Sequence, residues 1–196
     1  MFTLETPRLI VRPLVMDDLE AIHRLLDVEL READFGSEEP KLLDERARWL
    51  QWTVMGYEQF AKLYQPPYGE RALVLKETGR LIGACGYVPC LNQFEQLPTF
   101  SPSGPAAPVR FNTPEFGLFY AISPAFQRQG YTTEAVRAMI DYAFRELRVK
   151  RIIATTSYDN AGSMGVMRKL GMRIEKNPFA DPPWLQVVGV LENEME

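Results

Sequence analysis

A nearly continuous apolar segment that leads through a glycine-containing loop into a helical pattern constrains the fold of this chain most. Residues 115–123, EFGLFYAIS, carry few polar side chains, which is typical of a central strand covered on both faces. Pro124 ends the strand, and the loop QRQGYTT follows at 127–133. The helix expected from about Thr132 then has one apolar face, formed by Val136, Met139, Ile140 and Ala143.

Strand and helix patterns cover most of the N-terminal part. In TPRLIVRPL, Leu9 and Val11 alternate with their neighbours and predict a strand that ends at a proline. Asp17 and Glu20 have the spacing of a capping box at the start of a helix. A second helical period follows, with an apolar face of Trp49, Leu50, Val54 and Tyr57.

The remaining elements complete a mixed sheet. RALVLKETGRLIGACGYVPC has two apolar runs around a Thr78-Gly79 turn, as in a β-hairpin. RIIATTS predicts a short buried strand, and NAGSMGVMRKLG predicts a helix that ends at Gly171. MRIEK and WLQVVGVLE predict two closing strands. The expected order is β-α-α-β-β-β-α-β-α-β-β, which is an α/β (α+β) fold in one domain over residues 1–196.

A long proline-rich loop is predicted at 91–114. Its prolines are Pro98, Pro102, Pro105, Pro108 and Pro114, and few apolar pairs separate them. Loops of this length in compact domains usually serve a function or move. The sequence on either side is too short to close two separate cores, so a domain linker is not expected.

Composition excludes several classes of protein. The chain has two cysteines, Cys85 and Cys90, and one histidine, His23, whereas a structural zinc site needs four such ligands. A net charge of −4 argues against a general nucleic-acid binder. The sequence shows neither a signal-peptide pattern nor an apolar run near the length of a membrane span. We therefore expect a cytoplasmic protein with no metal and no membrane or nucleic-acid partner.

The 127–133 loop has the chemistry of an anion site. Backbone N–H groups at the start of a helix lack intrahelical partners and lie at its positive end. Gly130 lets a ligand approach the backbone, Arg128 adds a positive charge, and Thr132 and Thr133 add hydroxyl donors. An ordinary strand–helix connection with a solvated arginine is the alternative. The loop matches neither GxxxxGK[ST] nor GxGxxG.

Three motifs across almost the whole chain resemble the GNAT N-acetyltransferases. QRQGYT resembles the family's acyl-CoA pyrophosphate loop, in the variant that continues as GYTTEA at 130–135. The opening TPRLIVRPL and the later NAGSMGVMRKLGM resemble the RimJ/RimL branch, which acetylates α-amino groups of ribosomal proteins and, in many relatives, other amines. The resemblance implies the GNAT fold, a mixed and mostly antiparallel sheet flanked by helices.

The resemblance also implies a site for acetyl-CoA. It assigns the pyrophosphate to Gln127, Arg128, Gln129, Gly130, Tyr131, Thr132 and Thr133. It places Ala121, Ile122 and Ser123 beside the acyl donor, with a backbone N–H that polarises the thioester carbonyl. Asn160 would contact the pantetheine arm, although asparagine is also a favoured helix cap.

Catalytic residues are implied with less agreement to the family pattern. Glu115 opens the central strand in an E-x-G setting that resembles the family's glutamate base, and an ordinary strand-end carboxylate is the alternative. Many members have a tyrosine seven residues after the asparagine, but Met167 stands here and cannot donate a proton. Ser163 is the substitute that the resemblance offers, and a capping or solvent-facing serine is its alternative. Thr132 stands where the family prefers Gly or Ala.

The expected function is N-acetyl transfer from acetyl-CoA to a primary amine, on a small molecule or a protein N-terminus. The amine would attack directly in a ternary complex, because no cysteine is placed to carry an acyl group. A CoA-binding sensor that has lost catalysis is a second hypothesis, and a nucleotide-binding protein is a third, disfavoured by the missing Walker lysine. The acceptor depends on 31–40 and 91–114, which match no pattern, and the oligomeric state, including a homodimer, stays open.

Overall fold

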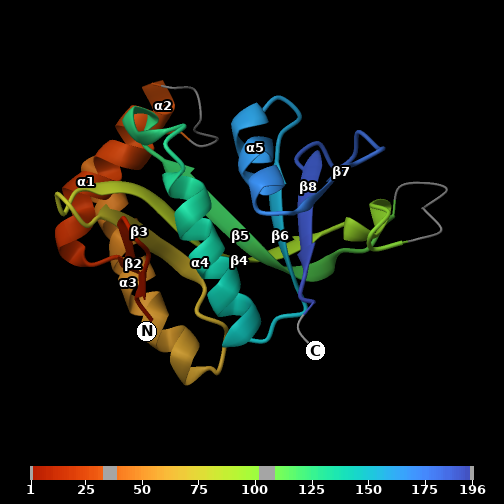
Figure 1. The fold of residues 1–196 in the computed structure, drawn as a ribbon, viewed down its shortest axis with the longest axis horizontal. Helices are drawn as coiled ribbons and strands as arrows, with labels where there is room; N and C mark the ends of the chain where they lie inside the picture. The colour runs from red at the N-terminus through yellow and green to blue at the C-terminus, as the bar shows by residue number, and fades with distance from the viewer. Residues whose placement is uncertain (1, 33–38, 102–108, 195–196) are drawn as a thin grey trace. The chain divides into compact units, whose positions relative to one another are not determined.

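A computed structural model describes residues 2–32, 39–101 and 109–194 of the chain (Figure 1). Strands are hydrogen-bonded in the order β1-β2-β3-β4-β5-β6-β8-β7. The strands are β1 (Leu4–Glu5), β2 (Leu9–Pro13), β3 (Gly69–Leu75), β4 (Leu81–Asn92), β5 (Thr113–Ile122), β6 (Arg151–Thr156), β7 (Arg173–Lys176) and β8 (Val187–Glu192). The helices are α1 (Leu19–His23), α2 (Leu30–Glu32), α3 (Leu43–Lys62), α4 (Tyr131–Arg145) and α5 (Ala161–Lys169).

The sheet is mixed and mostly antiparallel, which confirms the predicted fold class. The pairs β1–β2, β2–β3, β3–β4, β6–β8 and β7–β8 are antiparallel. β5 and β6 run parallel, with Gly117 opposite Ile153. The element order also agrees with the prediction, apart from two short elements: β1, whose two residues carried no strand pattern of their own, and α2, which covers only three residues.

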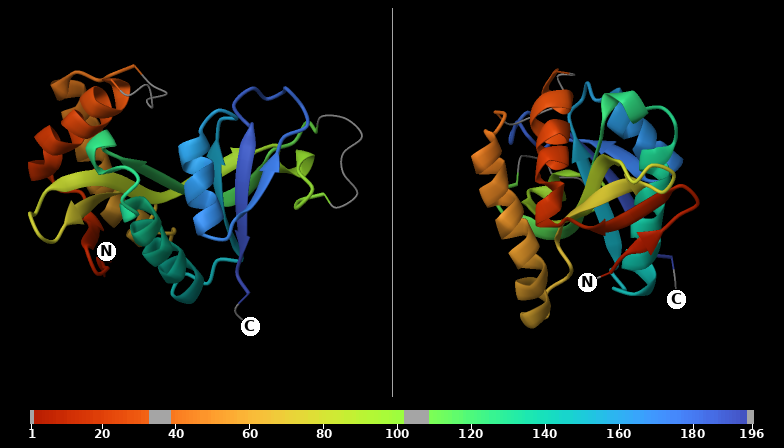
Figure 2. Two further views of the ribbon diagram at one scale, coloured as in Figure 1. Left: turned by 45° about the horizontal axis from the view of Figure 1, so that its top comes forward. Right: turned by 90° about the vertical axis from the view of Figure 1, so that its left-hand side faces the viewer.

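The described chain separates into two compact units. The N-terminal unit contains the residues up to Tyr87 and Phe119–Met139, and the C-terminal unit contains Val88–Leu118 and the residues from Ile140 onward. In the N-terminal unit α3 packs against α1 and β3 (Figure 2). In the C-terminal unit α5 packs against β6 and β7 (Figure 1).

Each unit has an apolar core that agrees with the sequence pattern. Leu9 and Val11 of β2 are fully buried, as the strand alternation predicts. One cluster of the N-terminal unit includes Leu14, Ile22, Leu25, Leu50, Ala72, Val74 and Ala84. The C-terminal unit buries Phe94, Leu97, Ile153, Leu185, Val188 and Val190 together.

The predicted cap at Asp17 is wrong, because the capping-box carboxylate belongs to Asp18 at the third residue of a 3-10 turn, and the Asp18 side chain does not cap α1. The neighbouring Asp18 accepts a hydrogen bond from the backbone N–H of Val15 at 2.9 Å and closes a 3-10 turn over Met16–Asp18 before α1 begins. Both Asp18 oxygens also accept from the guanidinium of Arg12, at 2.7 and 2.8 Å. This charge-assisted pair fixes the buried carboxylate of Asp18. A local sequence pattern cannot predict the pair, because it joins a strand residue to a turn residue.

A buried ion pair fixes the start of α3. The guanidinium of Arg46 donates from Nε and Nη2 to the Asp27 carboxylate at 2.8 and 2.7 Å, and the backbone N–H of Lys41 donates to it at 2.9 Å. The two side chains are only 7% and 3% exposed. Burial alone would raise the pKa of Asp27, but hydrogen bonds from Arg46 and Lys41 outweigh it and hold that pKa below its ordinary value.

Arg46→Ala should therefore lower the free energy of unfolding by about 3–5 kcal/mol at pH 7, because it leaves a buried carboxylate without its cation. The lowered pKa of Asp27 makes this contribution complete above about pH 4 and removes it as the pH falls through the folded-state pKa. Urea unfolding at pH 7 and pH 3 measures both effects. Arg48→Ala is the matched control, since its pair with Asp44 is exposed, and should change stability by less than about 1 kcal/mol. An equal loss in both variants would contradict this role of the buried pair.

Candidate functional site

The 127–133 loop has a backbone conformation that its sequence predicts only in part. β5 ends at Ile122, a 3-10 turn covers Pro124–Phe126, and α4 begins at Tyr131. Arg128 and Gly130 both lie in the left-handed region, with φ of 60° and 84°. Residues 128–130 are exposed. Glycine adopts the left-handed conformation without strain, which explains why a glycine suits position 130.

The start of α4 presents backbone donors toward the loop. The N–H of Glu134 donates to the carbonyl oxygen of Gly130 at 3.0 Å, which is the first α-helical hydrogen bond of α4. The N–H groups just before it have no carbonyl one turn back to bind. α4 contains Thr132 in its first turn, so the β-branched residue at this position does not delay the helix. The positive end of the helix dipole, these N–H groups and Arg128 together suit a bound phosphate.

The end of β5 lies close to β4 because Gly83 has no side chain. A Cβ at Gly83 would lie 2.6 Å from the carbonyl oxygen of Ala121 and 3.3 Å from the Cα of Ile122. The N–H of Ser123 donates to the carbonyl of Ile82 at 2.9 Å. Ser123 therefore already uses its backbone donor, so of the three residues expected beside the acyl donor Ser123 is the least suited to polarise a thioester carbonyl.

Asn160 caps α5, as one of its two interpretations predicts. Its Oδ1 accepts a hydrogen bond from the N–H of Ser163 at 2.9 Å. The cap uses only the side-chain oxygen, and the NH₂ group keeps two donors for a ligand. Met167 lies fully buried on the same helix, and its Sδ would lie 2.9 Å from a Cβ at Gly189. The position that many relatives fill with tyrosine is thus a core position here.

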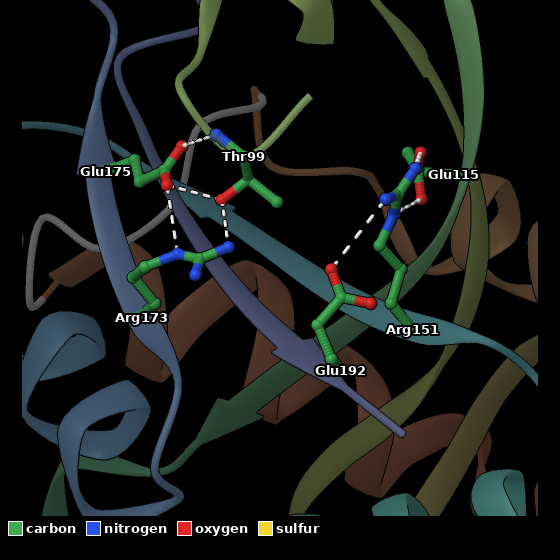
Figure 3. Close-up of polar contacts among 6 residues, drawn as sticks. All are labelled: Thr99, Glu115, Arg151, Arg173, Glu175 and Glu192. Atoms are coloured by element: carbon green, nitrogen blue, oxygen red, sulfur yellow. Dashed lines mark hydrogen bonds and ion pairs between the residues drawn. The ribbon is translucent and has the colours of Figure 1, made fainter. Parts of the chain in front are cut away.

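Glu115 forms a close ion pair that the sequence analysis did not foresee (Figure 3). Nε of Arg151 donates to Oε2 of Glu115 at 2.7 Å, and Nη2 donates to Oε1. Glu192 lies 3.8 Å from Nη1 of the same arginine. The hydrogen bond with Glu115 is the main reason that the pKa of Arg151 is raised. Both carboxylate oxygens are engaged, so the pair offers a structural role for Glu115 beside the catalytic one.

The first part of the predicted 91–114 loop is anchored. Phe94 and Leu97 are fully buried in and beside a 3-10 turn at Phe94–Gln96. Thr99 donates to Glu175 from its hydroxyl and, at 3.1 Å, from its backbone N–H, and Arg173 contacts both residues (Figure 3). The guanidinium of Arg151 lies 4.4 Å from the Phe100 ring centroid. Residues 102–108, and 33–38 of the other candidate acceptor loop, lie outside the described residues.

Both cysteine thiols should be inert in the folded protein. Burial raises the pKa of Cys85 to about 12, against a smaller opposite effect of Arg71. Burial and the charge of Glu115 raise the pKa of Cys90 to about 11. A neutral thiol is a poor nucleophile.

We expect a disulfide reagent at pH 7 to label neither thiol in the native protein and to label both in urea. Fast labelling of the native protein, together with a burst of acyl-enzyme in the transfer reaction, would contradict direct attack of the amine.

The structure distributes the predicted site residues between the two units. The 127–133 loop and residues 121–123 belong to the N-terminal unit. Glu115, Asn160 and Ser163 belong to the C-terminal unit. Within the described parts of the chain, no helix is long and apolar enough to cross a membrane.

One contact to the loop was missed by sequence analysis. Nη1 of Arg8 donates to the carbonyl oxygen of Gln129 at 3.0 Å, and Nε donates to Glu134 at 2.7 Å. Both residues stand inside motifs that resemble the family, TPRLIVRPL at 6–14 and GYTTEA at 130–135. The signal in the sequence is the opposite sign of the charges in the two motifs, with arginines in the first and Glu134 in the second.

The chain is similar to several known proteins. Residues 8–173 match the family described as "Acetyltransferase (GNAT) domain". "Uncharacterized N-acetyltransferase YoaA" of Bacillus subtilis is 27% identical over 88% of this chain and 83% of its own length. "Uncharacterized N-acetyltransferase YnaD" of the same organism is 38% identical over 33% of this chain, and this match spans only 38% of its own length.

Solved structures share the fold. The ribosomal-protein-S5-alanine acetyltransferase of Vibrio fischeri superposes with a TM-score of 0.68, covering 99% of this chain and 98% of that one. The two are 17% identical, so this likeness concerns the fold alone.

Proposed function

Because the chain belongs to the GNAT acetyltransferase family, we propose that it transfers the acetyl group of acetyl-CoA to a primary amine by direct attack in a ternary complex. The observation that carries this proposal is the 127–133 loop, where Gly130 in the left-handed conformation meets the start of α4. A diphosphate is the ligand that unpaired N–H groups at a helix start and Arg128 suit best. The family match then selects acyl-CoA among diphosphate ligands.

In this proposal the contacts to the donor are those that the resemblance to the family implies. The loop from Gln127 to Thr133 binds the pyrophosphate, and the side-chain NH₂ of Asn160 contacts the pantetheine arm. A backbone N–H of Ala121 or Ile122 polarises the thioester carbonyl. One aimed backbone donor contributes roughly 3–4 kcal/mol to such a transition state.

The amine must be neutral when it attacks. At pH 7 about 0.04% of a lysine amine is neutral, against roughly 10–15% of an α-amine. Transfer to an α-amine therefore needs about two orders of magnitude less help from a base. This favours an α-amine or another weakly basic amine as acceptor, as in the RimJ/RimL branch.

Glu115 is the proposed base and Ser163 the proposed acid. The Glu115 side chain is 8% exposed, so the proton would travel through a bound water rather than directly. A carboxylate has about four lone pairs, and the bidentate Arg151 pair uses two of them, so Glu115 keeps the capacity to accept. Ser163 is the third residue of α5 and would protonate the departing thiolate.

A CoA-binding sensor is the second candidate function. Buried Met167 in place of the tyrosine acid, together with the engaged carboxylate of Glu115, favours it. A sensor would bind acetyl-CoA without consuming it.

An acceptor screen with release of the CoA thiol as readout separates the two functions. The panel should span N-terminal peptides, polyamines, aminoglycosides and amino acids, with acetylated product confirmed by mass spectrometry. Gly130→Val supplies the matched protein that lacks the donor site. We expect acceptor-dependent thiol release, strongest for α-amines. Tight acetyl-CoA binding without release for any acceptor would support the sensor instead.

A further inference from the structure

We propose that Arg8 is a positioning residue for the cofactor loop, and that its ion pair with Glu134 sets the affinity of the chain for acetyl-CoA. This inference rests on the proposed function. It concerns residues of the N-terminal unit only, because Arg8, Glu134 and the loop all belong to it.

Arg8 contacts the loop at two points, on either side of Gly130. Its Nη1 donates to the carbonyl oxygen of Gln129 at 3.0 Å. Its guanidinium lies 4.2 Å from the centroid of the Tyr131 ring, within the range of a cation–π contact. A Cβ at Gly130 would lie 3.4 Å from Nη2. The residues before and after the left-handed glycine are therefore both held against one planar cation, and the position of the glycine leaves room for that cation beside it.

Glu134 in turn fixes Arg8. Its Oε2 accepts from Nε of Arg8 at 2.7 Å, and its Oε1 accepts from the backbone N–H of Arg8 at 2.9 Å. The hydroxyl of Thr6 donates to the same oxygen at 2.5 Å. Burial would raise the pKa of Glu134, but these hydrogen bonds from Thr6 and Arg8 hold that pKa below its ordinary value, so the carboxylate is ionised at neutral pH.

The arrangement explains how the loop keeps its donors available for a ligand. A peptide carbonyl and the N–H of the next residue point in opposite directions across the peptide plane. When Arg8 holds the Gln129 carbonyl, the N–H of Gly130 is turned to the other side of that peptide. The fork of the guanidinium can bind a carboxylate and a carbonyl at once, and a lysine ammonium has no such fixed fork. The positioning role therefore requires the planar guanidinium of an arginine, and a positive charge alone does not suffice.

Two measurements test this role: the affinity for acetyl-CoA, and whether a substitution changes the KM for acetyl-CoA or the kcat. We expect Arg8→Gln and Arg8→Lys each to raise the Kd and the KM for acetyl-CoA about 10- to 100-fold, which is the scale of losing a hydrogen bond made by a charged group. The kcat at saturating acetyl-CoA and the KM for the amine should change little. Glu134→Gln should reproduce the effect, and the double variant with Arg8→Gln should be no worse than either single change.

Lys76→Ala is the matched control for charge. It removes one cation from the same unit, where Lys76 pairs with Glu5 at 2.9 Å, and it should leave the Kd unchanged. Thermal unfolding confirms that each variant is folded. A Kd unchanged in both Arg8 variants, or restored by Arg8→Lys, would overturn the positioning role. Failure of the wild-type protein to bind acetyl-CoA would instead refute the proposed function, so the two failures are distinguishable.

Discussion

Gly130→Val should abolish binding of acetyl-CoA, with an increase in Kd of more than about 100-fold. The backbone φ of 84° at this position is strained for any residue with a side chain and most of all for a β-branched one. A Cβ would also lie 3.4 Å from Nη2 of Arg8, and in the proposed complex the valine side chain would occupy the space that the pyrophosphate needs. Isothermal titration with acetyl-CoA measures the loss.

Gly79→Val separates strain from the loss of the site. Gly79 has a φ of 69° in the hairpin between β3 and β4, and nothing lies within 4 Å of its would-be Cβ. Both substitutions should therefore cost about 1–2 kcal/mol of stability through the left-handed backbone alone. Only the change at Gly130 should remove binding. Normal CoA affinity in Gly130→Val would show that the phosphates bind elsewhere.

Glu115→Gln and Ser163→Ala should lower kcat with little change in the Kd for acetyl-CoA. Neither residue is a main anchor of the donor in the proposed mechanism, and general acid–base assistance typically contributes 10²–10⁴-fold. If Glu115 removes the proton, the acidic limb of the kcat/KM profile should shift or disappear in Glu115→Gln. The amine gives a limb of its own, so wild type and variant must be compared with the same acceptor.

The ion pair with Arg151 requires a control in this experiment. Glu115→Gln also disturbs a largely buried pair, whereas Glu192→Gln alters the same arginine at 3.8 Å and leaves Glu115 in place. We expect the Glu192 variant to keep the wild-type pH profile. Profiles of Glu115→Gln and wild type that superimpose after scaling would remove Glu115 from the mechanism and leave the pair with a structural role. A loss of tenfold or less in Ser163→Ala would show that water replaces the serine.

Local patterns were enough to predict the strand, loop and helix that carry the proposed donor site. The continuous apolar run of β5, the proline after it and the period of α4 are all readable within about 30 residues. The Asn160 cap was predictable for the same reason, because it is bound three residues away. The left-handed φ of Gly130 fits the role that the sequence suggested for it.

Long-range polar pairs could not be predicted from these patterns. Arg8 and Glu134 are 126 residues apart, and Glu115 and Arg151 are 36 apart. Periodicity shows which face of an element is buried but not which charges meet across a sheet. The burial of Phe94 and Leu97 could not be predicted for a different reason. The prolines that follow these residues make the whole segment resemble a loop.

Ligand-dependent stability is the most direct test of the central claim that the 127–133 loop binds acyl-CoA. At a concentration of 100 times its Kd, acetyl-CoA should add about 2.7 kcal/mol to the free energy of unfolding. For a domain of this size that corresponds to a rise in Tm of roughly 5–11 °C. ATP at the same concentration should give no comparable rise. A rise with ATP and none with acetyl-CoA or CoA would contradict the assignment.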